Sequence, residues 1–299
     1  MRVFVTGATG FIGSAVVHEL LTAGHQVIGL ARSDKSAAAL KAAGASVHRG
    51  SLDDLDSLQE GVRAADGVIH LAFGHDFSDY AGAVETDLRA VEAMGAVLEG
   101  TGKPFVGTSG TMMLSFVLPQ GQAGTEDDVL VDSVPRGAAE NAAIALAERG
   151  VRSSVIRLAP SVHGDTMAGF VSLLIAVARE KGVSAYVGEG SNRWPAIHRL
   201  DAARLFRLAL ESAPAGSRLH GVGEEGVKLL DIANVIGRHL NLPVVSISRE
   251  EADTHFGFVG AAASIDNTTL NELTRKRVGW EPVHLGLIAD LEQGQYFNN

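Results

Sequence analysis

The chain has no cysteine among its 299 residues, which excludes disulfides, a thiolate nucleophile and a cysteine-ligated metal. Aromatic residues make up only 5% of the sequence, and no uninterrupted apolar run is long enough to span a membrane. Basic residues are outnumbered 25 to 35, and the net charge of -10 argues against a general binder of nucleic acid or anionic membranes. The start lacks a signal-peptide pattern, so we expect a cytoplasmic protein.

The first thirteen residues carry the most informative pattern. A β-branched and aromatic run at 2–6 stops at Gly7, and further glycines follow at Gly10 and Gly13, where an apolar helix begins. Gly7 permits a sharp turn, Gly10 lets the backbone approach a phosphate, and Gly13 lets the helix pack closely on the strand. Free N–H groups and a positive dipole at the helix start suit a pyrophosphate. The pattern therefore predicts a dinucleotide site.

The second expected strand indicates which dinucleotide binds. The strand at 25–30 is followed by Arg32 and Ser33, and an acidic residue comes only at Asp34. A carboxylate near this point binds the ribose of NAD, whereas arginine accommodates the 2′-phosphate of NADP. Arg32 offers a planar fork, Ser33 a hydroxyl and Lys35 a further positive charge. We expect NADP(H); the alternative is a solvated surface arginine.

Strands and helices alternate through the first half, which predicts an α/β fold with a doubly wound parallel sheet. The expected strands are 2–6, 25–30, 45–48, 67–71, 104–108 and 153–158. The expected helices are 13–23, 35–43, 53–61, 81–99 and 136–149. Ligands bind such sheets beyond the carboxyl ends of the strands. The long connection at 112–134 lies at that edge and is a candidate lid.

Several segments in this order resemble the extended or atypical short-chain dehydrogenase/reductase superfamily. They are TGATGFIG at 6–13, SLD at 51–53, VIHLA at 68–72, TSG at 108–110, IRLAPSVHG at 156–164 and NRWPAIHRLDAA at 192–203. The resemblance implies a Rossmann-type nucleotide domain over 1–160, with a contribution from about 200–222. It implies that 161–299 form mostly a smaller α/β substrate-binding lobe. The expected cofactor contacts are Gly7, Thr9, Gly10, Phe11, Ile12, Gly13, Arg32, Ser33, Leu52, Asp53, Leu71, Ala72, Phe73, Thr108, Arg136, Pro160 and Val162.

One departure from the superfamily concerns the proton donor, which is commonly a tyrosine four residues before a lysine. None of the three tyrosines here is followed by such a lysine. With Glu140 matched to the acid that commonly follows that motif, Asp132 falls at the tyrosine position and Arg136 at the lysine position. We expect Arg136 in the first turn of its helix, with Glu140 as a possible partner. Arginine does not shuttle protons, but it can bind ribose hydroxyls or phosphate.

Two residues are the catalytic candidates. Ser109 follows the fifth strand, where the superfamily places a Ser or Thr that hydrogen-bonds the reacting oxygen, and Thr108 and Thr111 are neighbours that could share the role. The alternative is a hydroxyl that satisfies a strand-end backbone group. Tyr80 opens a helix just after His75-Asp76, and this group could supply a proton at neutral pH. Helix capping by Asp76 or Ser78 is the structural alternative for the residues before it.

The remaining candidates concern the cleft, metals and assembly. His163 and His198 are candidates for the substrate cleft, although either alone is an ordinary packing group. The eleven histidines show no tight ligand spacing, so we expect no metal. The apolar helices at 81–99 and 136–149 correspond to a dimer interface in the superfamily, and a homodimer competes with complete burial of these helices against the sheet.

The sequence thus predicts an NADP(H)-dependent oxidoreductase. The expected reaction is hydride transfer to or from a small organic carbonyl, imine or activated alkene, with a small molecule as the substrate. The hydride chemistry would belong to the cofactor, while the protein would orient the reactants. Two alternatives stay open: a non-catalytic sensor of NADP(H), and a sugar-nucleotide-type epimerase or dehydratase.

Overall fold

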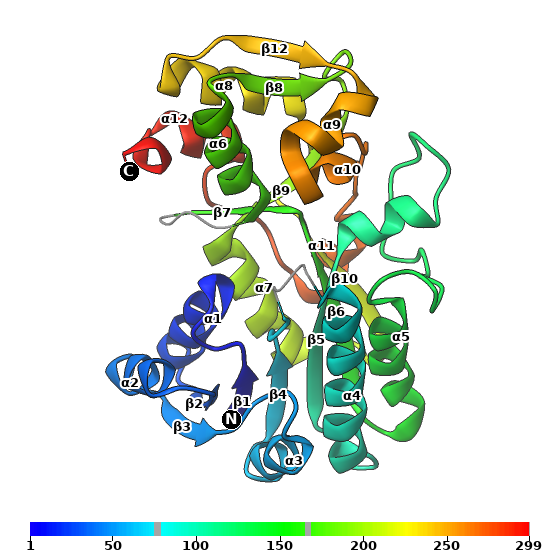
Figure 1. The fold of residues 1–299 in the computed structure, drawn as a ribbon. Helices are drawn as coiled ribbons and strands as arrows, with labels where there is room; N and C mark the ends of the chain where they lie inside the picture. The colour runs from blue at the N-terminus through cyan, green and yellow to red at the C-terminus, as the bar shows by residue number, and fades with distance from the viewer. Residues whose placement is uncertain (75–78, 165–168, 299) are drawn as a thin grey trace.

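The first strand, β1 (Arg2–Thr6), is buried on both sides along most of its length. Successive side chains of a strand point to opposite faces, so Val3 and Val5 enter one apolar core while Phe4 enters another. A strand of this kind has to lie inside a sheet that is covered on both faces. The computed structural model, which describes residues 1–74, 79–164 and 169–298, has this arrangement (Figure 1).

The central sheet has seven strands, all parallel to their neighbours. In spatial order they are β10 (Ser217–Gly221), β6 (Arg152–Leu158), β5 (Pro104–Gly110), β4 (Gly67–His70), β1, β2 (Gln26–Ala31) and β3 (Ser46–Arg49). Strand order reverses between β1 and β4, and the crevice for a ligand in such a sheet lies at this point. The prediction of a doubly wound parallel sheet is confirmed.

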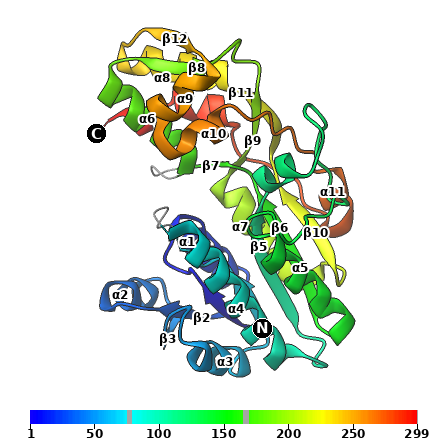
Figure 2. The ribbon, with the colours of Figure 1, turned by 45° about the vertical axis from the view of Figure 1, so that its right-hand side comes forward.

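Three helices cover each face of the sheet. One face carries α1 (Phe11–Thr22), α2 (Asp34–Ala42) and α7 (Arg199–Ser212), and the other carries α3 (Leu55–Arg63), α4 (Tyr80–Leu98) and α5 (Gly137–Ala145). α5 continues as a 3-10 turn at Leu146–Arg149. Figures 1 and 2 show α1 and α4 on opposite sides of the strands, with their first turns at the sheet edge that faces the upper lobe.

The upper lobe in Figure 1 has its own core around Trp194 and Ile232. Its strands are β7 (Ser161–His163), β9 (Arg193–His198) and β11 (Glu224–Lys228) in one sheet, with β8 (Ser184–Val187) and β12 (Val244–Ile247) as a parallel pair. Its helices are α6 (Gly169–Lys181), α8 (Leu229–Leu240), α9 (Arg249–Phe256), α10 (Gly260–Ala263) and α12 (Leu287–Glu292), with 3-10 turns at Gly257–Val259 and Gln295–Phe297. α11 (Glu272–Val278) packs near β10 and α7. None of the helices in the described ranges is long and apolar enough to cross a membrane.

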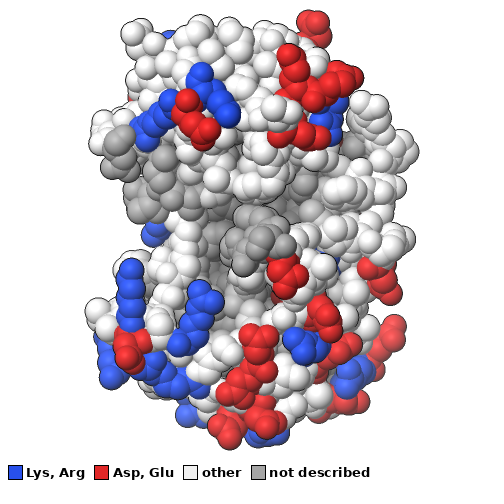
Figure 3. Space-filling view, in the orientation of Figure 1, with Lys and Arg blue, Asp and Glu red and all other residues white. Residues whose placement is uncertain are grey.

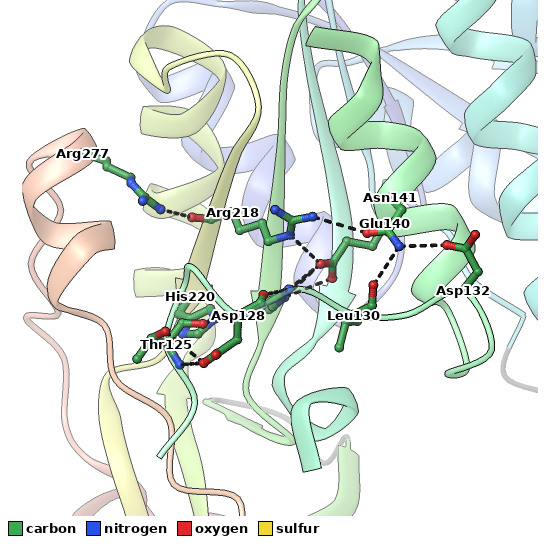
Figure 4. A network of polar contacts seen from close by, with 10 residues as sticks. Thr125, Asp128, Leu130, Asp132, Glu140, Asn141, Arg218, His220 and Arg277 are labelled. Atoms are coloured by element: carbon green, nitrogen blue, oxygen red, sulfur yellow. Dashed lines mark hydrogen bonds and ion pairs between the residues drawn. The ribbon is translucent and has the colours of Figure 1, made fainter. Parts of the chain in front are cut away.

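A fully buried arginine anchors the long connection between β5 and α5, which begins as a 3-10 turn at Thr111–Phe116. Arg157, on β6, forms an ion pair with Glu140 at 2.5 Å and donates to the Asp128 carbonyl at 2.7 Å. Arg218 donates to the same Glu140 carboxylate at 3.0 Å (Figure 4). Arg157 also donates to the Thr125 carbonyl at 3.5 Å. Because a buried charge is costly unless it is paired, these bonds hold residues 125–128 against the sheet. In this structure, that part of the candidate lid is therefore bonded to the central sheet.

Candidate nucleotide site

The turn between β1 and α1 is built for close backbone approach. Gly7 has φ +67°, and a Cβ on it would lie 2.7 Å from the Ala72 backbone nitrogen. A Cβ on Gly13 would lie 2.0 Å from the Gly7 carbonyl oxygen, so only glycine lets α1 pack this closely. Gly10 caps α1 without any side chain. The first-turn amides, beginning at Phe11, are therefore open toward a ligand, as an anion site at a helix start requires.

The carboxyl end of β2 presents exposed polar side chains beside this turn. Arg32 is exposed, and within the described residues it has no hydrogen-bond or ion-pair partner. The Ser33 hydroxyl accepts a bond from the Ser36 amide at 3.2 Å and so caps α2. Asp34 forms an ion pair with Arg49. Figure 3 shows Lys and Arg side chains gathered over the part of the surface where α2 lies, while acidic side chains gather over α3.

The other expected contacts lie at the carboxyl ends of neighbouring strands. Leu52 is partly buried after β3, and Asp53 is exposed, 3.8 Å from Arg89. Leu71, Ala72 and Phe73 are partly buried after β4, as are Pro160 and Val162 around the start of β7. Thr9 is exposed and Ile12 partly buried at the glycine turn.

A chain of buried polar contacts connects the glycine turn to the far end of the site. Thr6 Oγ1 lies 2.7 Å from His70 Nδ1, and His70 Nε2 lies 3.0 Å from Asp87 Oδ1. The Ala72 amide donates to Thr6 Oγ1 at 3.1 Å, so the Thr6 hydroxyl hydrogen is available for His70 Nδ1. His70 then carries its hydrogen on Nε2 and donates it to Asp87. Each of these side chains has a partner, which keeps the strand ends in fixed positions.

The Asp87 carboxylate also accepts hydrogen bonds from Arg136. Arg136 Nε and one terminal nitrogen donate to Asp87 Oδ2 at 3.2 and 3.1 Å, and that terminal nitrogen also donates to the Thr108 carbonyl at 2.6 Å. Burial opposes ionisation of Asp87, but the Arg136 guanidinium and the His70 imidazole outweigh it and lower the pKa of the Asp87 carboxyl. These bonds orient the Arg136 side chain, and its second terminal nitrogen has no hydrogen-bond partner among the described residues.

The expected helical context of Arg136 is wrong. Arg136 is the N-cap of α5, with φ 63°, and the helix begins at Gly137. A left-handed conformation is unfavourable for a residue with a Cβ, and the bonds to Asp87 and Thr108 hold Arg136 in it. Glu140 is not its partner, because that carboxylate bonds Arg157 and Arg218. Asp132 accepts a bond from Asn141.

Tyr80 lies beside Arg136, with Phe73 between them. The Tyr80 and Phe73 ring centroids are 5.8 Å apart, and the Arg136 guanidinium carbon lies 4.3 Å from the Phe73 centroid. Burial raises the pKa of the Tyr80 phenol, with a smaller opposing effect from Arg136. Tyr80 therefore stays protonated at neutral pH, as a proton donor must. His75 and Asp76, expected beside it, lie outside the described residues.

Ser109 differs from its two neighbours in how its hydroxyl is used. Thr108 Oγ1 donates to the His70 carbonyl at 2.7 Å, and Thr111 Oγ1 donates to Asn267 Oδ1 at 3.0 Å. Ser109 is 3% exposed, and its Oγ has no partner among the described residues. A buried hydroxyl without a partner costs free energy. The expectation that Ser109 follows the fifth strand is wrong, because Ser109 lies within β5.

A family model described as the NAD dependent epimerase/dehydratase family matches residues 3–220. The chain belongs to that family. A relative from Schizosaccharomyces pombe, "Uncharacterized protein C2A9.02", is 51% identical over 99% of this chain and 100% of its own length. A second relative, "Uncharacterized protein YLL056C" from Saccharomyces cerevisiae, is 44% identical over 100% of both chains. The expected resemblance to the extended short-chain dehydrogenase/reductase superfamily is thereby confirmed.

Solved structures of this epimerase/dehydratase fold resemble the chain over nearly its whole length. The dTDP-glucose 4,6-dehydratase DesIV of Streptomyces venezuelae, with NAD bound, has a TM-score of 0.77 at 18% identity and covers 100% of this chain and 98% of its own. The UDP-glucose 4-epimerase of Thermotoga maritima, with UDP-glucose, has a TM-score of 0.77 at 19% identity. It covers 99% of this chain and 98% of its own. These structures share the fold.

Two further features concern a histidine cluster and a pocket. His163 Nδ1 lies 2.7 Å from Asp290 Oδ2, and its ring meets that of His198 edge-on at 5.4 Å. Burial, and then the neighbouring His163, lower the pKa of His198. In addition, a pocket of about 340 Å³ opens between the turn after β5 and residues 264–268. The described residues hold no group of three or more acidic or histidine side chains arranged to bind a metal ion.

Sequence reasoning missed Asp87, which bonds both His70 and Arg136. An aspartate inside an apolar helix is the signal that could have found it. Thr6 and His70 lie in segments that the resemblance had marked, but neither was given a role. Arg199 was also missed. Its sequence context, directly after His198 in NRWPAIHRLDAA, lies within a segment that the resemblance had marked.

Proposed function

We propose that this protein is an NADP(H)-dependent oxidoreductase of the cytoplasm. The reaction would be hydride transfer to or from a small organic carbonyl, imine or activated alkene. The observation that carries the choice of NADP(H) is Arg32, which is exposed at the carboxyl end of β2 without a partner among the described residues. The nearby acid, Asp34, is engaged with Arg49 and so is less able to bind a ribose. NAD in the solved structure of DesIV supports a nicotinamide dinucleotide here.

The residues around the strand ends fit such a dinucleotide. The close packing of Gly7 and Gly13, with the uncapped first turn of α1, suits a pyrophosphate. Arg32, Ser33 and Lys35 would meet the 2′-phosphate, and Leu52 with Asp53 would lie by the adenine side. The second terminal nitrogen of Arg136 would donate to the nicotinamide-side ribose. The remainder of the dinucleotide would be enclosed by Leu71, Ala72, Phe73, Thr108, Pro160 and Val162.

The dinucleotide, when bound, supplies or accepts the hydride. The chain's own contribution is to polarise the acceptor and move a proton. Ser109 Oγ, which has no partner among the described residues, would hydrogen-bond the reacting oxygen. The protonated Tyr80 phenol is the acid we assign. Arg136 fixes a positive charge at this end of the site and transfers no proton.

Cofactor titration of wild type and Arg32→Ala tests the proposal. Wild type should bind NADPH more tightly than NADH, and Arg32→Ala should lower the affinity for NADPH alone. Loss of a charged phosphate contact is worth roughly 1.5–3 kcal/mol, or about tenfold to a hundredfold in affinity. Lys41→Ala, which removes an exposed cation from the last turn of α2, is the matched control. Equal wild-type affinities for NADPH and NADH would contradict the assignment.

A sensor of NADP(H) without turnover is the second candidate, because the residue at the lysine position is an arginine held by Asp87. A panel of carbonyl substrates separates the two: bound NADPH that none of them consumes supports the sensor.

The proposal extends to a homodimer through α4 and α5, and sedimentation velocity tests it. A monomer at micromolar concentration would contradict that part.

A further inference from the structure

Arg199 carries a positive charge across from α7 to the glycine turn. Its guanidinium carbon lies 5.1 Å from the centroid of the Phe11 ring, and Phe11 is the first residue of α1. Arg199 is partly buried, its Nε is buried without a hydrogen-bond partner, and no carboxylate in the described ranges forms an ion pair with it. A partly buried cation with no counter-ion is costly and calls for an anion.

Gly164 creates the space that Arg199 occupies. A Cβ on Gly164 would lie 2.7 Å from Arg199 Cγ and 2.9 Å from Cδ, so the arginine stem runs directly over this glycine. Gly164 has φ +139°, a conformation that residues with a Cβ rarely adopt. Its amide donates to the Tyr296 hydroxyl at 2.7 Å, and its carbonyl oxygen lies 2.8 Å from the same hydroxyl. The absence of a side chain on Gly164 therefore makes room for the Arg199 stem.

Among the described residues, the charged and titratable groups near Arg199 do not compensate its charge. His198 precedes Arg199 in the chain. The His163 ring meets the His198 ring at 5.4 Å, and the His198 ring stacks on that of His284 at 4.6 Å. The two carboxylates of the cluster are already engaged: Asp290 bonds His163 at 2.7 Å, and Asp201 bonds His284 at 2.9 Å. On the opposite side lie the uncapped first-turn amides of α1, which also favour an anion.

We propose that Arg199 binds the pyrophosphate of the dinucleotide, as a cationic clamp that reaches from α7 over the first turn of α1. The inference rests on the proposed dinucleotide function and adds a residue to it. Guanidinium groups match phosphate oxygens with paired hydrogen bonds. Phe11 supports the flat guanidinium on one side, which orients it before the ligand arrives.

Fragment binding tests the clamp. Arg199→Ala should weaken NADPH binding by about tenfold to a hundredfold. It should leave the affinity for adenosine 2′-monophosphate unchanged, because that fragment has the 2′-phosphate but lacks the pyrophosphate. Arg199→Lys should fall between wild type and Arg199→Ala, because the charge survives while the fork geometry is lost. NADPH binding is measured by fluorescence, and fragment binding by ligand-observed NMR.

Arg207→Ala is the matched control. Arg207 is also a cation on α7 that reaches α1, where it bonds Glu19 at 2.7 Å. Its loss should lower the thermal midpoint without changing the affinity for NADPH. Unchanged NADPH affinity in Arg199→Ala, or an equal loss for adenosine 2′-monophosphate, would overturn the clamp alone. Failure of wild type to bind either NADPH or NADH would overturn the proposed function together with the clamp.

Discussion

Replacing His220 should make the stability of the protein less sensitive to acid. His220 is fully buried on β10, where its Nδ1 lies 2.7 Å from the Leu270 carbonyl oxygen and its Nε2 lies 3.4 Å from a nitrogen of Arg157. Burial, and then the Arg157 charge, lower the pKa of His220 to about 3. A proton on Nε2 would face a guanidinium inside the core, so the folded protein excludes it.

The sign and size of the effect follow from linkage. The unfolded chain binds a proton at this histidine near its ordinary pKa of 6.5, whereas the folded chain does so only near 3. The free energy of unfolding is therefore almost unaffected at pH 7.5 and above, and it falls as the pH drops through 6.5 toward 3. At pH 5.5 the cost is about 1.4 kcal/mol, and at pH 4.5 it is about 2.7 kcal/mol.

Urea denaturation at pH 7.5 and 5.5 measures this. Wild type should lose about 1.4 kcal/mol more over this interval than His220→Gln, whatever the absolute stability of the variant. The control variant is His18→Gln, which removes an exposed histidine. Its change in unfolding free energy over the same pH interval shows the effect of removing one histidine that is not buried. The carboxylates and the other histidines are present in both wild type and His220→Gln, so the comparison measures the difference made by His220. If His220→Gln loses as much stability as wild type, the argument from burial beside Arg157 is refuted.

Three more predictions concern the nucleotide site. Gly13→Ala should destabilise the protein by at least about 3 kcal/mol in denaturation, because its Cβ would lie 2.0 Å from the Gly7 carbonyl; an unchanged midpoint would contradict the close packing. Asp87→Asn should cost about 3–5 kcal/mol and weaken NADPH binding, since it leaves Arg136 partly unpaired; retained stability and affinity would show that the pair is dispensable. Ser109→Ala and Tyr80→Phe should each lower turnover roughly a hundredfold with NADPH binding intact, and full turnover in both would place the acid elsewhere.

The fold could be predicted because its signals are local. Apolar runs such as 2–6 and 104–108 fix buried strands, and glycines at strand ends fix the turns. The expected helix at 136–149 begins one residue later and changes to a 3-10 turn at Leu146. Its start depends on Arg136 being held in a left-handed conformation by Asp87, 49 positions away, and no local pattern encodes that contact.

The same division applies to the site. The glycine turn, with its Gly7 and Gly13 contacts, follows from spacing alone, because each glycine has a steric reason within the turn. The pairing of Glu140 with Arg157, and not with Arg136, cannot be predicted from spacing, because Arg157 lies on a neighbouring strand. Sequence spacing suggests a partner for Arg136 one helical turn away. Arg157 is fully buried, however, and an unpaired buried charge costs more free energy than an unpaired exposed one, so Glu140 pairs with Arg157.

The bond between Gly164 and Tyr296 has a consequence for the order in which the protein matures. The two residues are 132 positions apart, whereas every strand of the central sheet lies within residues 2–221. Since a chain folds from its N-terminal side during synthesis, the sheet and the glycine turn have all their parts before Tyr296 leaves the ribosome. The Gly164 segment under Arg199 therefore gains its bonds to Tyr296 only after the strands of the central sheet have been synthesised.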